Sequence, residues 1–372
     1  MERNLAIIGA SYLQLPLILR AKEMGFRTHV FAWAAEDVGE AAADVFWPIS
    51  IVEKERILEK CREIGICGIC SIASDLAVVT VNYVADALGL PGNSVESTAR
   101  CTNKHAMRMA LERAGDPSPR SILVDGDTDP TAYGLAWPVI VKPTDRSGSR
   151  GIRLVKRPED LAEAVREARE QSFEKRVLVE EFAEGKEYSV EYISFRGKHT
   201  FLAVTEKFTT GAPRFIETGH REPAPLSEDT RARIRQVVEH ALDTLGVENG
   251  ASHSEVKIDG EGRIRIIEIG ARMGGDCIGS DLVPLSTGMD FVGMVIRVAC
   301  GEAPDFTRIR EPMAVESVFL LTREDLEELE RLQREEPEEI LRIADFHPEL
   351  LGGARDSSGR AGCYIRRARK EG

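Results

Sequence analysis

Short apolar runs alternate with longer amphipathic stretches over the first part of the chain. Each apolar run has the length of a buried strand, and each stretch after it repeats its apolar positions with a helical period. Strands are expected at 5–10, 28–32 and 66–72, and helices from the first strand through residue 24, over 53–64 and over 75–88. Strand, helix and strand in this order form right-handed βαβ units, which predicts a small doubly wound α/β domain with a parallel sheet over residues 1–96.

The rest of the chain mixes strands and helices without regular alternation. Helices are expected over 97–116, 158–171 and 227–245, and strands over 121–124, 138–142, 176–182, 252–258 and 263–270, with a long mixed β region at 187–218. This pattern predicts an α+β body over residues 97–305. The tail, 306–372, is expected to be a small β-containing piece that closes the cleft, with a charged amphipathic helix over 323–343.

Two loops of the first domain are candidates for a ligand cleft. In parallel sheets ligands bind beyond the carboxyl ends of strands, which selects residues 9–12 and 71–75. Only Gly9 of the GxGxxG fingerprint is present, so a nicotinamide dinucleotide site is not expected. Ser74 and Asp75 could instead cap the helix that follows them.

Composition and charge exclude several classes of protein. The chain has 372 residues and a net charge of -13, which argues against nucleic acid as a partner because no basic face is visible. The N-terminus lacks a signal-peptide layout and no apolar run approaches the roughly 20 residues of a membrane span, so a cytoplasmic protein without membrane contact is expected. The seven cysteines have irregular spacing, and Cys67 and Cys70 lie in an apolar run, which favours buried thiols in a reducing compartment.

A lysine and a small-residue loop form a candidate phosphate site. The strand expected over 138–142 ends in a lysine, Lys142, which Pro143 follows, and residues 145–151 form a Gly/Ser-rich loop. Backbone N–H groups of such a loop can close over phosphates, with the lysine as a point charge. An ordinary hairpin loop remains the alternative. No GxxxxGK[ST] motif occurs, so a P-loop is excluded.

Acidic residues follow the next buried strand. Glu180 and Glu181 end the apolar run that begins at 177, and Glu187 comes seven residues after Glu180. These carboxylates could accept hydrogen bonds from an adenine amino group or ribose hydroxyls, although an exposed acidic turn would have the same sequence.

A hairpin at 252–270 carries the most informative residues. A four-residue turn at 259–262 would pair residue 258 with residue 263, so that Glu255 faces residue 266 and Glu268 lies one diagonal step away.

Glu255 and Glu268 then share one sheet face with Lys257, Gly270 and Arg272. Two adjacent carboxylates are reasonable if they share divalent cations, and Mg²⁺ prefers a few carboxylates together with substrate phosphates. Arg272 would neutralise charge on a transferring phosphoryl group. A salt-bridge cluster is the structural alternative.

Together these motifs resemble the ATP-grasp superfamily, over roughly residues 1–305. The resemblance rests on the order 88–94 (LGLPGNS), Asn103-Lys104, Val141-Lys142-Pro143, the Ser/Gly loop, Glu180-Glu181-Phe182 with Glu187, Glu255, and 268–272 (EIGAR). Within the superfamily the chain looks most like carboxylate–amine ligases related to L-amino-acid ligases and carbamoyl-phosphate-synthase-like proteins. Residues 218–223 resemble the Gly-His-x-x-Pro element of that group.

The resemblance implies an ATP-grasp fold over 97–305, with a lid subdomain at about 120–185, and a role for each matching residue. The phosphates would be contacted by Lys104 and Lys142 and covered by the lid loop with Ser147, Gly148, Ser149 and Gly151. The adenine would be flanked by Glu180, Glu181, Phe182 and Ala183, and the ribose would be held by Glu187. Mg²⁺ (or Mn²⁺) would be held by Glu255 and Glu268, and the catalytic residues would be Arg272, Lys257 and His220. His220 could instead be structural. Gly270 departs from the family, because many members carry a metal-binding Asn at that position.

The implied activity is ATP-dependent formation of an acyl phosphate, which an amine then attacks to give an amide, ADP and phosphate. The substrates would be a small carboxylate and an amine such as an amino acid or small peptide. A carboxyphosphate-using carboxylase or purine-pathway enzyme is the alternative, and a non-catalytic nucleotide-binding regulator is a third. The guesses for the substrate pocket are Tyr12, Ser74, Met273, Gly274, Gly275 and Asp276. A homodimer is one option for the oligomeric state.

Overall fold

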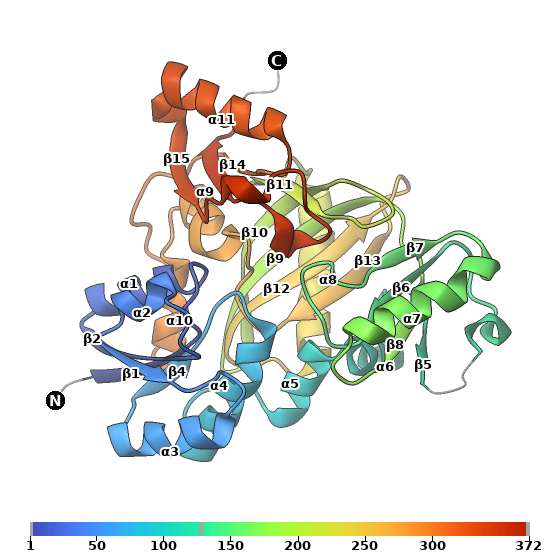
Figure 1. Ribbon diagram of the computed structural model, residues 1–372. Coiled ribbons are helices and arrows are strands. Elements are labelled where there is room, and N and C mark those ends of the chain that lie inside the picture. The colour runs from blue at the N-terminus through green and yellow to red at the C-terminus, as the bar shows by residue number, and fades with distance from the viewer. Residues whose placement is uncertain (1–2, 126–128, 370–372) are drawn as a thin grey trace.

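The computed structural model describes residues 3–125 and 129–369. Figure 1 shows a blue N-terminal unit, a green unit on the far side, and a long twisted sheet between them that continues into the red C-terminal segment. None of the described helices combines the length and the apolar composition that a bilayer crossing requires.

The N-terminal unit is a four-stranded parallel sheet. Its order is β3-β2-β1-β4, from β1 (Arg3–Ile8), β2 (Phe26–Ala32), β3 (Val45–Pro48) and β4 (Gly68–Cys70). Its helices are α1 (Leu15–Glu23), α2 (Val38–Ala42), α3 (Lys54–Ile64) and α4 (Asp75–Leu88). The central strand β1 is apolar because residues 5–8 are fully buried, as expected for a strand covered on both faces. The predicted βαβ pattern is confirmed, and only the short elements α2 and β3 were missed.

Two helices, not one, follow the parallel sheet. α5 (Val95–Thr102) ends at Asn103, and α6 (Lys104–Ala114) begins directly after it. The Asn103 side chain accepts hydrogen bonds from the backbone N–H groups of His105 (3.0 Å) and Ala106 (3.1 Å), so the residue caps the second helix. The prediction of one helix over 97–116 is therefore wrong. The break places Lys104 in the first turn of α6.

The green unit is a small antiparallel sheet, which we call the lid sheet. Its order is β5-β8-β6-β7, from β5 (Ser121–Val124), β6 (Val139–Pro143), β7 (Arg153–Val155) and β8 (Val177–Glu181). Helix α7 (Leu161–Gln171) packs its buried Leu161, Ala164 and Ala168 against this sheet. The loop 144–152 between β6 and β7 is the predicted Gly/Ser loop.

The large sheet has eight strands in the order β13-β12-β9-β10-β11-β14-β16-β15. Its first five strands in the chain are β9 (Lys186–Phe195), β10 (Lys198–Thr209), β11 (Glu217–Glu222), β12 (Gly250–Ile258) and β13 (Ile264–Gly270). Helix α8 (Glu228–Leu245) covers one face and buries Ile234, Val238 and Leu242 there.

The C-terminal segment continues the large sheet. β14 (Val315–Phe319) pairs with β11, and β16 (Cys363–Arg367) lies between β14 and β15 (Ile340–Ala344). The helix expected over 323–343 is wrong at its end, because α11 (Arg323–Glu335) stops before Pro337 and the chain then forms edge strand β15.

Helix α10 (Phe291–Ala299) joins the large sheet to the parallel sheet. A Cβ at Gly68, the first residue of β4, would lie 2.8 Å from the Ala299 carbonyl oxygen, so only glycine allows this approach. One continuous apolar core therefore runs through both units. Cys70 is buried on β4, Cys67 is half-buried with its Sγ 3.9 Å from that of Cys300, and all seven thiols are free.

Candidate active site

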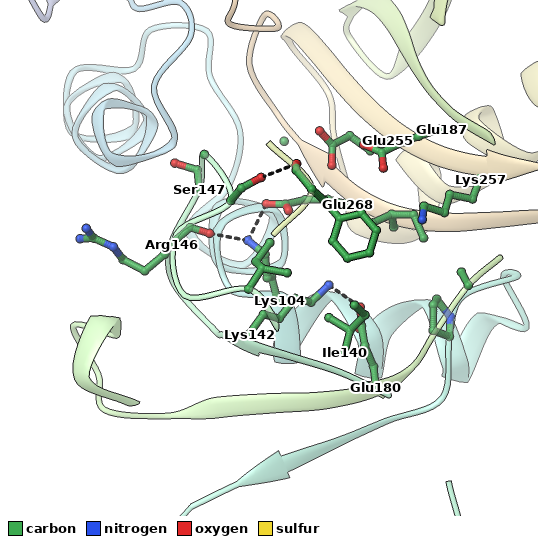
Figure 2. A pocket seen from close by; sticks show the side chains of 18 of the residues that line it. Lys104, Ile140, Lys142, Arg146, Ser147, Glu180, Glu187, Glu255, Lys257 and Glu268 are labelled. Atoms are coloured by element: carbon green, nitrogen blue, oxygen red, sulfur yellow. Dashed lines mark hydrogen bonds and ion pairs between the residues drawn. The ribbon is translucent and has the colours of Figure 1, made fainter. Parts of the chain in front are cut away.

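A cavity lies between the lid sheet and the large sheet, and we call it the first cavity. Figure 2 shows Lys104 and Lys142 on one side of this space, and Glu187, Glu255 and Lys257 on the other. Most residues that the sequence selected line it: Lys104, Lys142, Ser147, Gly148, Ser149, Glu180, Glu181, Phe182, Ala183, Glu187, Glu255, Lys257, Glu268 and Arg272.

Glu255 and Glu268 are direct cross-strand neighbours in this cavity. β12 and β13 pair Ile258 with Ile264, and a β-bulge next to Glu255 then shifts the register, so that Glu255 faces Glu268. The predicted pairing of residue 258 with 263 is wrong, but the shared face of the two carboxylates is confirmed. The bulge also brings Ile267 to the cavity wall, although strict alternation had predicted the opposite face.

A buried lysine compensates each of these carboxylates. Lys104 Nζ donates to Glu268 Oε1 at 2.7 Å, and Lys207 Nζ lies 2.5 Å from Glu255 Oε1 and 2.9 Å from Glu187 Oε1. Burial alone would lower the pKa of Lys207, but Glu187 and Glu255 raise it well above its usual value. Burial raises the pKa of Glu255, but Lys207 reverses that effect and holds it well below its usual value. The charged forms are thus favoured on both sides of the pair.

Lys207, which the sequence reading missed, lies opposite Glu187 on the neighbouring strand. One signal was available, since a Glu-Lys dipeptide interrupts the apolar stretch 201–208 of a strand that is otherwise buried. A lysine inside such a strand needs carboxylate partners.

A second charged cluster lies beneath the lid sheet. Lys142 and Arg108 both form ion pairs with Glu180. Arg108 Nε lies 3.1 Å from Glu180 Oε2. Burial raises the pKa of Glu180, but Arg108 and Lys142 together lower it below its usual value. Arg108 Nη2 also donates to the Ile267 carbonyl oxygen at 2.6 Å. Arg108 was missed, yet it lies one helical turn after Lys104, on the same face of α6.

One end of the first cavity is aromatic. The rings of Phe182 and Phe215 lie 6.0 Å apart between centroids, and Lys257 Nζ is 4.7 Å from the centre of the Phe182 ring. Burial lowers the pKa of Lys257. An apolar slot with a few polar groups at its edge suits a flat heterocycle.

His253 adds positive charge at the other end. Its Nδ1 pairs with Glu191, and its Nε2 lies 3.6 Å from Glu255 Oε1. Burial lowers the pKa of His253, but Glu191 outweighs burial and raises it to about 9. The imidazole is therefore held as a cation beside the carboxylate pair.

Arg272 lies at the same end and is held by Asp75, the first residue of helix α4 in the N-terminal unit. Its Nε and Nη2 donate to the two oxygens of Asp75, at 2.7 and 3.0 Å. Ser74 accepts from the N–H of Ala77 and so caps α4. The two alternatives for this loop are both realised, because Ser74 is the cap and Asp75 faces the cleft.

A second cavity adjoins the first and shares Glu255 and Arg272 with it. Its wall combines the N-terminal unit, the large sheet and the C-terminal segment: Tyr12, Asp75, Arg150, Lys207, Glu217, His220, His253, Gly275, Asp276, Asp345, Ser357 and Arg360. Of the guessed pocket residues, Tyr12, Gly275 and Asp276 lie here, whereas Met273 is buried in the core.

His220 lines this second cavity rather than the first. It is fully buried, its Nε2 lies 3.8 Å from Asp276 Oδ2, and burial lowers its pKa, so the neutral ring is favoured. Asp276 is fixed by two hydrogen bonds from Arg360, a residue of the C-terminal segment that carried no recognisable motif. Gly151 lines neither the first nor the second cavity. A Cβ at this position would lie 3.0 Å from Pro143 and 3.1 Å from Gln171, so the glycine packs closely against the lid.

The carboxylate pair suits Mg²⁺ by its chemistry. Within residues 3–125 and 129–369, no group of three or more His, Cys, Asp or Glu side chains could enclose an ion. Two carboxylates without further protein ligands match the way Mg²⁺ is held, by one or two carboxylates together with substrate phosphates.

Residues 135–281 match the ATP-grasp domain family. The chain is 30% identical over 237 residues to a D-alanine–D-alanine ligase of Halorhodospira halophila, an alignment that covers 60% of this chain and 74% of that ligase. It is 27% identical over 249 residues to an alanine–anticapsin ligase of Bacillus subtilis, covering 60% of this chain and 52% of that protein. The chain spans about half the length of several of the curated relatives it matches.

The fold agrees with a solved ligase over nearly the whole chain. The crystal structure of L-amino acid ligase from Bacillus licheniformis superposes with a TM-score of 0.84 at 25% identity, covering 99% of this chain and 94% of that one. The N-terminal unit and the C-terminal strands are thus part of the shared architecture.

Proposed function

Because this chain belongs to the ATP-grasp family, we propose that it is an ADP-forming ligase that activates a small carboxylate and joins it to an amine. The observation that carries the proposal is the direct opposition of Glu255 and Glu268 in a cavity that also collects Lys104, Lys142 and Arg272. The similar proteins named above are ligases, and their names give alanine and other amino acids as substrates.

In this proposal the first cavity binds ATP. The aromatic end, with Phe182 and Ala183 and the flanking Glu180 and Glu181, receives the adenine, and Glu187 accepts from the ribose. Lys104 and Lys142 contact phosphate oxygens as point charges. The loop with Ser147, Gly148 and Ser149 closes over the phosphates, and Gly151 packs against the lid at the end of that loop.

Glu255 and Glu268 would hold Mg²⁺, or Mn²⁺ in its place, which neutralises phosphate charge when bound. Gly270 supplies no side chain to that site. Lys207 holds the pKa of Glu255 well below its usual value, which favours the ionised carboxylate that a metal needs. Glu268 accepts a hydrogen bond from Lys104.

The reaction follows from the position of the second cavity. An oxygen of the substrate carboxylate attacks the γ-phosphorus of ATP, the bond to ADP breaks, and an acyl phosphate forms. The uncharged amine then attacks the carbonyl carbon, a C–N bond forms, phosphate leaves with the electron pair, and the nitrogen loses a proton. Arg272 neutralises the developing charge, and neutral His220 is a candidate acceptor for the proton. Lys257, which the sequence predicted to be catalytic, lies beside Phe182 at the aromatic end, so in this proposal it contacts the nucleotide and not the reacting carboxylate.

Water must be excluded while the acyl phosphate exists, because water competes with the amine as nucleophile. The loop at 144–152 borders both cavities through Ser147 and Gly148, so its closure would cover both reacting groups.

The test is release of ADP from Mg-ATP with pooled amino acids, singly and in pairs, with mass detection of products. ADP together with an amide product for particular pairs supports the ligase. ADP that depends on bicarbonate would identify a carboxyphosphate enzyme instead. Tight ATP binding without ADP under any condition would identify a regulator.

We place the reaction in the cytoplasm, because seven free thiols suit a reducing compartment. A homodimer is one option for the oligomeric state, and sedimentation of the purified chain would decide it.

A further inference from the structure

The positively charged side chains around the second cavity differ in whether they have a carboxylate partner, and this difference bears on the substrate. Four of its five cationic side chains have a carboxylate partner: Lys207 with Glu255, His253 with Glu191, Arg272 with Asp75, and Arg360 with Asp276. The fifth, Arg150, has no carboxylate within ion-pair distance among the residues that the structure describes.

Arg150 comes from the loop 144–152 and is half-buried. Its Nε is shielded from solvent and has no hydrogen-bond partner in the described part of the chain. A desolvated guanidinium nitrogen without a partner is unfavourable, and an anion from outside the protein would remove that penalty.

The side chain of Arg150 is directed to the second cavity. A Cβ placed on Gly148 would lie 3.9 Å from Arg150 Nε, from Arg150 Nη2 and from Ser357 Cβ, so the guanidinium packs against Gly148, which borders the second cavity together with Ser357. Arg150 lines the second cavity and is not on the wall of the first, although its neighbours Ser147 and Gly148 border both. Its position therefore favours a group of the substrate over a phosphate of the nucleotide.

The chemistry of the proposed reaction indicates which substrate group needs a cation. The reacting carboxylate faces Arg272 and the metal-binding pair. The amine must lose its proton before it attacks, so an ammonium charge does not persist to the step that forms the C–N bond. If the amine substrate is an α-amino acid or a peptide, its remaining charge is a free carboxylate.

We propose that Arg150 binds the free carboxylate of the amine substrate, which makes that substrate an α-amino acid or peptide and not a simple amine. This inference rests on the proposed ligase function. The planar guanidinium can donate two parallel hydrogen bonds to a carboxylate, and closure of the loop 144–152 would bring this contact and the cover over the phosphates into place together.

The test compares α-amino acids with their primary amides, which keep the amine and lose the negative charge. Wild type, Arg150→Gln and Arg150→Lys are titrated calorimetrically in the presence of Mg²⁺ and a non-hydrolysable ATP analogue, and are assayed for ADP release. Arg153→Gln is the matched control, because Arg153 pairs with Glu163 and Glu167 on the lid and lines neither cavity.

We expect wild type to bind at least one amino acid more tightly than its amide. Arg150→Gln should weaken binding of the acid by about tenfold to a hundredfold, leave the amide and the ATP analogue unchanged, and abolish the preference. Arg150→Lys should retain only part of the preference for the acid over the amide, since lysine cannot form the bidentate contact.

Three outcomes would overturn the role of Arg150. These are an acid-over-amide preference that survives in Arg150→Gln, no such preference in wild type, and a loss of affinity for the ATP analogue instead of the amino acid. The calorimetry is independent of turnover, so a wild type that binds amino acids through Arg150 but forms no ADP would refute the ligase function alone.

Discussion

Gly270 and Asp75 approach each other so closely that no other residue fits at position 270 without displacement. A Cβ on Gly270 would lie 3.1 Å from Asp75 Oδ1 and 3.4 Å from the Arg272 guanidinium carbon. Because Gly270 of β13 has no side chain, the Asp75 carboxylate of α4 fits beside it. The departure from the family's asparagine is thus coupled to the ion pair that holds Arg272.

Replacing Gly270 with Asn should break the Asp75–Arg272 pair and lower kcat/KM for ADP formation by at least about tenfold, because Arg272 would lose its orientation. Asp75→Ala should have a similar effect. The double variant should lose less than the sum of the two, since both changes act on one contact. Strict additivity of the measured kcat/KM changes would contradict this coupling.

Glu268→Gln should lower turnover at least about a hundredfold, because one charge of the proposed metal site is lost and the ion pair with Lys104 is broken. The Mg²⁺ concentration needed for half-maximal ADP release should rise as well. Glu261→Gln, in the exposed turn of the same hairpin, is the control and should leave both quantities unchanged. Full activity of Glu268→Gln, with wild-type circular dichroism, would show that the assignment of this carboxylate is wrong.

Lys207→Met should lower the free energy of unfolding by about 3 kcal/mol in EDTA, because removing one partner leaves the buried Glu187 and Glu255 uncompensated. Mg²⁺ should recover part of this loss and stabilise the variant more than wild type. Urea unfolding with and without Mg²⁺ measures both effects. Lys198→Met, an exposed lysine at the start of the same strand, should respond to Mg²⁺ as wild type does.

Glu222 gives the protein a pH dependence of the opposite sign to most carboxylates. It is fully buried, and burial raises its pKa to about 7, although the hydroxyls of Ser286 and Thr205 partly offset that effect. The folded state therefore binds a proton that the unfolded state, with a pKa near 4.3, has lost. The stabilisation is present in full below about pH 4 and decreases as the pH rises toward 7.

Glu222→Gln should accordingly be more stable than wild type at pH 8, by about 2–3 kcal/mol, and nearly equal to it at pH 4.5. The difference between the two urea unfolding curves at each pH isolates this one group. Glu159→Gln, an exposed carboxylate of the lid, should show no such trend. A variant that is less stable than wild type at pH 8 would mean that the pKa of Glu222 is not raised in the folded protein.

Local patterns in the sequence were sufficient for the parallel sheet and for most of the first cavity. The apolar run at 5–8 predicts β1 by itself, and the strand that ends at Lys142 predicts both a lid strand and a charge at its end. Such features depend on residues close together in the chain, where periodicity is informative.

Features that depend on pairing over long distances could not be predicted in this way. The bulge at Glu255 is a property of two strands, and no residue of the turn at 259–262 specifies it. Arg360 contacts Asp276 from 84 positions away and belongs to no motif. The break at Asn103 was readable, because an asparagine between two amphipathic segments is a good helix cap, but continuous helical periodicity concealed it.

The order of strands at the C-terminal edge of the large sheet affects how the protein is made. β16, which comes after β15 in the chain, inserts between β14 and β15 and carries Cys363 into the wall of the second cavity. The ribosome must therefore release residues 363–367 before that edge can assemble. A nascent chain that has not yet released residues 363–367 would already contain the residues of the first cavity but not the complete wall of the second.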